Sequence, residues 1–223
     1  MLYIVSTPIG NLKDITYRAV EILKTVDLIA AEDTRHTKIL TNHYGIHAPL
    51  TSYFEHNKLT KTEYILKQLE SGKNVALVTD AGTPGISDPG YYLLKSAKER
   101  GIAVTVIPGA TACIAALSLS GLPSDQFVFI GFLPNKSAAR QKRLETLKEE
   151  GRTIIVYESV HRIVKTLTDI RDVLNNPYVA CVREITKKFE EVVEGRADEV
   201  LKKVSSKKPK GEFVLVLNLQ KKD

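Results

Sequence analysis

Cysteine is scarce in this chain, and long apolar runs are missing from it. The 223 residues include only two cysteines, Cys113 and Cys181, and both lie in apolar stretches. Such a chain has no disulfide framework of the secreted kind, so we expect two core cysteines and a reducing, cytoplasmic location. No apolar run approaches the roughly 20 residues that span a bilayer, and Met1–Thr7 lacks a basic segment before its apolar residues. We expect a soluble, untargeted protein with no membrane contact.

Two common ligand-binding patterns are also missing. The phosphate-gripping pattern GxxxxGK[ST] does not occur, which excludes a P-loop nucleotide-binding protein. His161 has no neighbouring His/Cys cluster with zinc spacing, so we expect no metal site.

Positive charge is in excess, and it is unevenly distributed. The formal net charge is +6, and residues 121–223 carry most of it, whereas residues 1–120 are nearly neutral. A polyanion-binding face and a solvated, lysine-rich surface both agree with this distribution. Charge alone does not separate the two interpretations.

The most informative segment is a loop rich in glycine and proline. Val75–Val78 is a short apolar run, and residues 79–90 that follow it contain three glycines together with Pro84 and Pro89 but no lysine. This pattern predicts a buried strand with a rigid loop at its carboxyl end, where open α/β sheets bind ligands. Without a lysine, the loop suits an uncharged or cationic small molecule.

Apolar runs and amphipathic segments alternate along the chain, which predicts an α/β fold of two domains, 1–120 and 121–223, with a boundary at Gly121–Ser124. In the first domain we expect a mostly parallel sheet, and in the second a mixed sheet with at least one antiparallel pair. The expected strands are 2–6, 28–31, 75–78, 104–107, 127–132, 153–157, 179–182 and 212–219. The expected helices are 16–25, 61–70, 91–100, 111–119, 138–150, 163–174 and 197–204.

Small-residue turns and polar clusters follow several of these strands. The turns are 7–11, 80–90 and 108–112, and the clusters are 31–35, 157–162 and 183–191. Each alone fits an ordinary turn, cap or solvated surface. Together they predict a shared ligand pocket and a composite site between the domains. Residues 135–143 place four cations at a helix start, where the helix dipole favours acids, which indicates an anionic partner or an exposed helix balanced by glutamates.

Taken in order, these motifs resemble the ribosomal RNA small-subunit methyltransferase I family of the tetrapyrrole methylase superfamily. The matching segments are 7–12, 31–35, 80–90, 108–109, 131–136, 157–162, 183–187 and 211–214. The chain departs from the family at Val160, where proline is usual, and at Ala110-Thr111, where Pro-Ser is usual. The resemblance implies 2′-O-methylation of a cytidine ribose in 16S rRNA, S-adenosylmethionine bound between the two domains, and a homodimer. It implies no GxGxxG motif, and the chain has none.

The resemblance and the strand-end turns together suggest site residues. For the donor pocket we expect Pro8, Asp80, Gly82, Thr83, Ile86, Asp88, Thr111, Ala112 and Leu133. For phosphate contacts we expect Arg35, Lys136, Arg140, Lys142, Arg143 and Arg162. For the reacting centre we expect Lys187 as a base, its pKa lowered by burial beside Arg183, with Asp33 and Glu184 as orienting groups.

Two other functions stay open on the sequence. A small-molecule methyltransferase of the tetrapyrrole type would share the donor site but need no basic groove. A non-catalytic RNA-binding assembly factor would have a basic surface but no affinity for the donor.

Overall fold

The computed structural model describes residues 1–88 and 90–220. Pro89 of the glycine loop and residues 221–223 lie outside the described residues. The chain forms two compact units, Met1–Thr111 and Ala112–Asp223. The sequence places the boundary later, at Gly121–Ser124, because those residues are turn formers. In the structure the chain divides before helix α5 (Ala112–Leu119), which lies against strands of the second unit.

The first unit is a doubly wound α/β sheet. Its five strands are all parallel in the order β3-β2-β4-β1-β5, as the alternation of strands and helices predicts. They are β1 (Leu2–Val5), β2 (Leu28–Ala31), β3 (Leu50–Ser52), β4 (Val75–Val78) and β5 (Val104–Ile107). The helices are η1 (Leu12–Asp14), α1 (Tyr17–Thr25), α2 (Thr34–Tyr44), α3 (Lys58–Glu70) and α4 (Gly90–Glu99).

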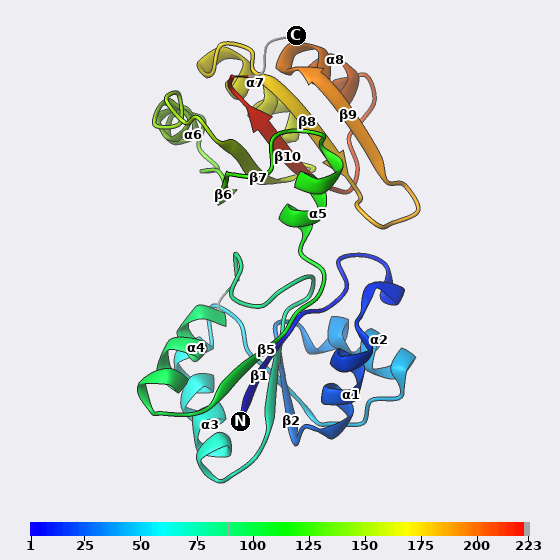
Figure 1. Cartoon of the computed structure of the whole chain (residues 1–223), viewed down its shortest axis with the longest axis vertical. Helices are drawn as coiled ribbons and strands as arrows, with labels where there is room; N and C mark the ends of the chain where they lie inside the picture. The colour runs from blue at the N-terminus through cyan, green and yellow to red at the C-terminus, as the bar shows by residue number, and fades with distance from the viewer. Residues whose placement is uncertain (89, 221–223) are drawn as a thin grey trace. The chain divides into compact units, whose positions relative to one another are not determined.

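Successive side chains along each strand point to opposite faces of the sheet, so this unit has two hydrophobic layers. Leu2 and Ile4 of β1 join the core with residues of α3 and α4, and Val5 joins the core with residues of α1 and α2. Figure 1 shows these two pairs of helices on opposite sides of the sheet. Both faces of the sheet are therefore covered by helices. The carboxyl ends of the strands stay open to loops, which is where a doubly wound sheet places its ligand.

The second unit has a mixed sheet in the order β6-β7-β10-β8-β9. The β6–β7 pair is parallel and the other three pairs are antiparallel, so the expected antiparallel pairing is confirmed. The strands are β6 (Phe127–Phe132), β7 (Thr153–Ser159), β8 (Tyr178–Arg183), β9 (Glu191–Arg196) and β10 (Glu212–Asn218). The helices α6 (Ser137–Glu145), α7 (Ile163–Val173) and α8 (Ala197–Ser205) pack on its core.

Four elements, η1, α2, β3 and β9, are absent from the sequence-based prediction, and α6 is shorter than expected. Residues 138–150 are predicted as one helix, but the α-helix ends at Glu145. Beyond that point Leu147, Lys148 and Glu150 donate to carbonyls three residues earlier, which is a series of tighter turns. Carboxylates at the helix C-terminus are disfavoured by the helix dipole, so Glu149 and Glu150 do not continue it.

Candidate functional site

Backbone contacts join the turn after β1 to the glycine loop after β4. Thr7 N donates to Gly82 O at 2.8 Å, and Gly82 N donates to Thr7 O at 3.2 Å. The Thr7 hydroxyl also donates to Thr79 O at 3.0 Å. The loop that follows β4 is therefore fixed against the end of β1, although the two segments lie far apart in the sequence.

Hydroxyl groups join the third turn to the same edge of the sheet. Thr83 Oγ1 lies 2.8 Å from Ser6 Oγ and 2.8 Å from Thr111 Oγ1, and it donates to Ala110 O at 3.3 Å. Gly109 is close to β1, because a Cβ there would lie 2.8 Å from Ser6 Cβ. The structure thus brings the three predicted turns together at one end of the first sheet.

The glycine loop depends on backbone conformations that most residues avoid. Gly82 and Gly85 have φ values of +89° and +88°, and Ser87 has a φ of 71°. Asp88 Oδ1 accepts hydrogen bonds from Gly85 N and Gly90 N, both at 2.8 Å. Burial raises the pKa of Asp88 despite these hydrogen bonds. The loop is held from inside by this carboxylate.

Three carboxylates gather beside the loop at the ends of β2 and β4. Glu32 Oε2 accepts from the Thr79 hydroxyl at 2.5 Å, and Asp80 Oδ1 accepts from Asp33 N at 3.0 Å. Burial raises the pKa of Asp80, and the nearby charge of Glu32 adds to the rise. A bound cation would relieve this repulsion, so the cluster favours a positively charged ligand.

Asp33 has a different environment from its neighbours. Its carboxylate accepts from Arg35 Nη2 at 2.6 Å and caps α2 by accepting from Arg35 N at 2.8 Å. These hydrogen bonds hold the pKa of Asp33 well below its usual range. Asp33 is a poor proton acceptor for that reason, and it orients Arg35, whose side chain is 90% exposed.

The turn after β8 in the second unit is strained. Glu184 and Thr186 have φ values of 52° and 63°, in the left-handed region that β-branched residues such as threonine avoid. Thr186 Oγ1 is buried and has no hydrogen-bond partner among the residues that the structure describes. Strain and unpaired polar atoms of this kind gather at functional sites, which singles out residues 183–187.

Lys187 is held between two carboxylates. Its Nζ lies 3.0 Å from Glu184 Oε1 and 2.8 Å from Glu212 Oε2. Burial lowers the pKa of Lys187, but the hydrogen bonds that Nζ donates to Glu212 and Glu184 outweigh burial and raise this pKa above its ordinary value. The expected lowering of this pKa is wrong, because two carboxylates hold the ammonium group. These two carboxylates favour the charged form of Lys187.

Two predicted phosphate contacts turn out to hold the fold together. Arg140 is 2% exposed and forms an ion pair with Asp169 at 2.6 Å, and its Nη1 donates to Asn135 O at 3.1 Å. Arg162 pairs with the buried Glu158 at 2.8 Å and donates to Leu133 O at 3.1 Å. Both guanidinium groups already have a carboxylate partner within the protein.

The other predicted RNA contacts remain on the surface. Lys136, Lys142 and Arg143 are exposed on or beside α6. Of the predicted donor residues, Pro8 and Gly82 are buried, Ile86 is 44% exposed, and Ala112 and Leu133 belong to the second unit. Sequence reasoning missed Glu212 as a partner of Lys187, although Glu212 lies in the recognised segment 211–214.

Comparison with known proteins agrees with this fold. Residues 1–201 match the family model of tetrapyrrole (corrin/porphyrin) methylases. The structure superposes on diphthine synthase with a TM-score of 0.76 at 16% identity, covering 97% of this chain and 89% of that one. It superposes on the uroporphyrin-III C-methyltransferase of Thermus thermophilus, crystallised with S-adenyl homocysteine, with a TM-score of 0.67 at 18% identity, covering 97% and 96% of the two chains. The family model covers most of the chain, so the chain belongs to the tetrapyrrole methylase family, and the superpositions show that it has the same fold.

A closer relative is known from sequence. The ribosomal RNA small subunit methyltransferase I of Escherichia coli O157:H7 is 51% identical over 219 residues, which cover 97% of this chain and 77% of the relative. The chain belongs to the ribosomal RNA small subunit methyltransferase I family. The family resemblance drawn from the sequence motifs is confirmed.

Proposed function

We propose that this protein transfers the methyl group of S-adenosylmethionine to the 2′-hydroxyl of a cytidine ribose in the 16S rRNA of the small ribosomal subunit. The observation that carries this proposal is the 51% identity to a small subunit rRNA methyltransferase over 97% of the chain. The strand-end geometry of the first unit agrees with it, because a methyl donor with a sulfonium charge suits carboxylates and a loop without lysine.

The donor binds, in this proposal, to the turns that Thr7, Thr83 and Thr111 hold together. Pro8, Gly82, Ile86 and Asp88 belong to the same edge, and Asp80 supplies negative charge beside it. The raised pKa of Asp80 supports this assignment, since a cationic ligand is the natural partner of crowded carboxylates. Ala112 and Leu133 stay in the predicted donor set.

The reaction is an in-line displacement. The ribose 2′-oxygen forms a bond to the methyl carbon, the carbon–sulfur bond breaks, and its electron pair stays on sulfur as S-adenosylhomocysteine. The hydroxyl proton leaves to solvent. Because the positive charge on sulfur disappears, alignment of the two reactants and exclusion of water supply much of the acceleration.

Lys187 assists, in this proposal, as an ammonium group. A fixed cation stabilises the negative charge that develops on the 2′-oxygen, and it lowers the pKa of the hydroxyl. Glu184 and Glu212 hold that cation in place. Asp33 orients Arg35 in the same way through their ion pair.

RNA is held by exposed cations. We propose Arg35, Lys136, Lys142 and Arg143 as phosphate contacts and leave out Arg140 and Arg162, whose charges are paired with carboxylates of the protein itself.

We further propose that the protein is a homodimer and acts in the cytoplasm. No helix in residues 1–88 and 90–220 is long and apolar enough to cross a membrane.

Two assays test the function against its alternatives. Calorimetry with S-adenosylmethionine should give a binding isotherm, whereas a non-catalytic assembly factor would give none. Small subunits from a strain lacking the activity should accept a labelled methyl group, whereas a small-molecule methyltransferase would leave them unlabelled. Absence of transfer with normal donor binding would leave the small-molecule function as the better account.

A further inference from the structure

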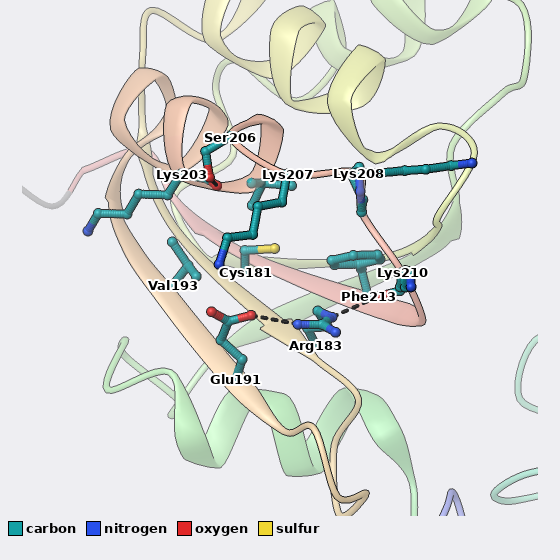
Figure 2. Close-up of a pocket in the computed structure, with 12 residues that line it drawn as sticks. Cys181, Arg183, Glu191, Val193, Lys203, Ser206, Lys207, Lys208, Lys210 and Phe213 are labelled. Atoms are coloured by element: carbon teal, nitrogen blue, oxygen red, sulfur yellow. Dashed lines mark hydrogen bonds and ion pairs between the residues drawn. The ribbon is translucent and has the colours of Figure 1, made fainter.

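A cavity of about 670 Å³ lies in the second unit between β8, β9, the end of α8 and the segment that leads into β10. Figure 2 shows the basic side chains around its mouth. Its volume falls within the range of about 300–1,000 Å³ that ligand pockets occupy. None of the predicted donor or RNA residues lines it.

Positive charge dominates the lining. It has five cationic side chains and one carboxylate, Glu191, and the cations are Arg183, Lys203, Lys207, Lys208 and Lys210. Glu191 is paired with Arg183 at 2.8 Å. Within residues 1–88 and 90–220, the four lysine side chains have no carboxylate partner. The cavity therefore carries unpaired positive charge.

One of these cations is fixed in advance. Arg183 Nε donates to the Lys210 carbonyl at 2.7 Å, as the dashed line in Figure 2 marks, while Nη1 bonds to Glu191. These bonds join the end of β8 to the segment before β10, which carries three of the lysines. Arg183 therefore fixes the position of the backbone segment that carries Lys207, Lys208 and Lys210.

The cavity is suited to binding and not to covalent chemistry. Cys181 and Phe213 line its apolar side and are 1% and 4% exposed. Burial raises the pKa of the Cys181 thiol to about 12, so the sulfur stays protonated and is a poor nucleophile.

We propose that this basic cavity binds the phosphodiester backbone of the RNA substrate, at a second contact separate from α6. The inference rests on the proposed function, which supplies a polyanion as substrate. In the sheet order β6-β7-β10-β8-β9, α6 follows one edge strand and the cavity borders the other. Four strand spacings separate the two edges by about 19 Å, a span that a polynucleotide bridges and a small anion does not.

The test replaces the three loop lysines together, as Lys207→Gln, Lys208→Gln and Lys210→Gln, in the full chain. The matched control replaces three exposed lysines of the first unit, as Lys24→Gln, Lys67→Gln and Lys98→Gln, which lowers the net charge equally. Affinity for 16S rRNA from a strain lacking the activity is measured between 50 and 200 mM salt. Each lost phosphate contact lowers the salt slope by roughly 0.7–0.9, so we expect a drop of about 2 and a loss of affinity of about tenfold.

The outcomes separate this inference from the proposed function. Equal salt slopes in the loop variant and the control would overturn the cavity as an RNA contact, with the methyltransferase function intact. Failure of the wild-type protein to bind RNA would overturn both. Inorganic pyrophosphate serves as a small-anion probe. If it binds the wild-type protein and not the loop variant while RNA affinity is unchanged, the cavity is a small-anion site and the inference is wrong.

Discussion

Individual cations of the second unit differ in what already surrounds them. Arg140 and Lys142 lie two positions apart on α6, yet Arg140 is buried against Asp169 and Lys142 is exposed. Lys187 lies between these extremes, because two carboxylates hold it while its side chain keeps 27% exposure. The charge of a side chain alone does not assign its role; the groups that it pairs with do.

Lys187 gives the first prediction at this scale. Replacing Lys187 by alanine should lower turnover by about 10²-fold or more, because a fixed charge at a developing anion contributes that much. Replacing it by arginine should restore part of the rate, since arginine keeps the charge but cannot serve as a base. Single-turnover kinetics, with S-adenosylmethionine and RNA both saturating, measure the rate of methyl transfer. An arginine variant as slow as the alanine variant would favour proton transfer over charge stabilisation.

Gly82 gives the second prediction. Gly82→Val forces a β-branched residue to a φ of +89° beside the proposed donor, so we expect donor binding to disappear. Gly72→Val is the matched control, because Gly72 has a φ of +88° in the turn between α3 and β4, with nothing within 4 Å of a Cβ. Both variants should lose about 1–3 kcal/mol of stability. Calorimetry with S-adenosylmethionine should separate them, and equal affinities would remove Gly82 from the pocket.

The sequence anticipates some of these residues better than others. The convergence of Thr7, Gly82 and Thr111 could be predicted, because turns after parallel strands meet at one edge of a sheet. The environment of Lys187 could not, since Glu212 lies 25 residues away and reaches it only through the pairing of β10 with β8. The burial of Arg140 could not be predicted either, because its partner Asp169 lies on another helix.

At the scale of elements, apolar strands were easy to predict and polar elements were not. β2, β4, β5 and β6 have the predicted bounds because apolar or aromatic residues dominate each, with only Thr105 in β5 and Gly131 in β6 as exceptions. α2 contains three threonines and two histidines in its eleven residues, which obscures its helical period. β9 carries charged residues at both ends and is held in the sheet by six residue pairs with β8. Tertiary pairing, which local sequence does not encode, decides such elements.

Helix α6 carries a prediction about stability. Arg140→Ala leaves Asp169 buried without its ion-pair partner, which should cost about 3–5 kcal/mol. Lys142→Ala on the exposed side of the same helix should change stability by less than about 0.5 kcal/mol. Urea unfolding followed by circular dichroism measures both variants. Similar unfolding midpoints would mean that Arg140 does not anchor the helix.

At the scale of the whole molecule, the distribution of charge predicts which surface of the protein contacts RNA. Neutralising Lys136, Lys142 and Arg143 together should reduce the salt slope of RNA binding by about 2, because each contact contributes roughly 0.7–0.9. The first-unit variant with Lys24, Lys67 and Lys98 replaced is again the control. Donor affinity should stay unchanged in both. A wild-type slope in the α6 variant would take that helix out of the RNA interface.

The central claim is methylation of a cytidine ribose in 16S rRNA, and nucleoside analysis of the product tests it most directly. Small subunits from a strain lacking the activity are incubated with the protein and labelled S-adenosylmethionine, and the 16S rRNA is then digested to nucleosides. We predict that the label appears in 2′-O-methylcytidine and that the Gly82→Val protein transfers none. Label in a base-methylated nucleoside, or no label in the RNA, would contradict the account.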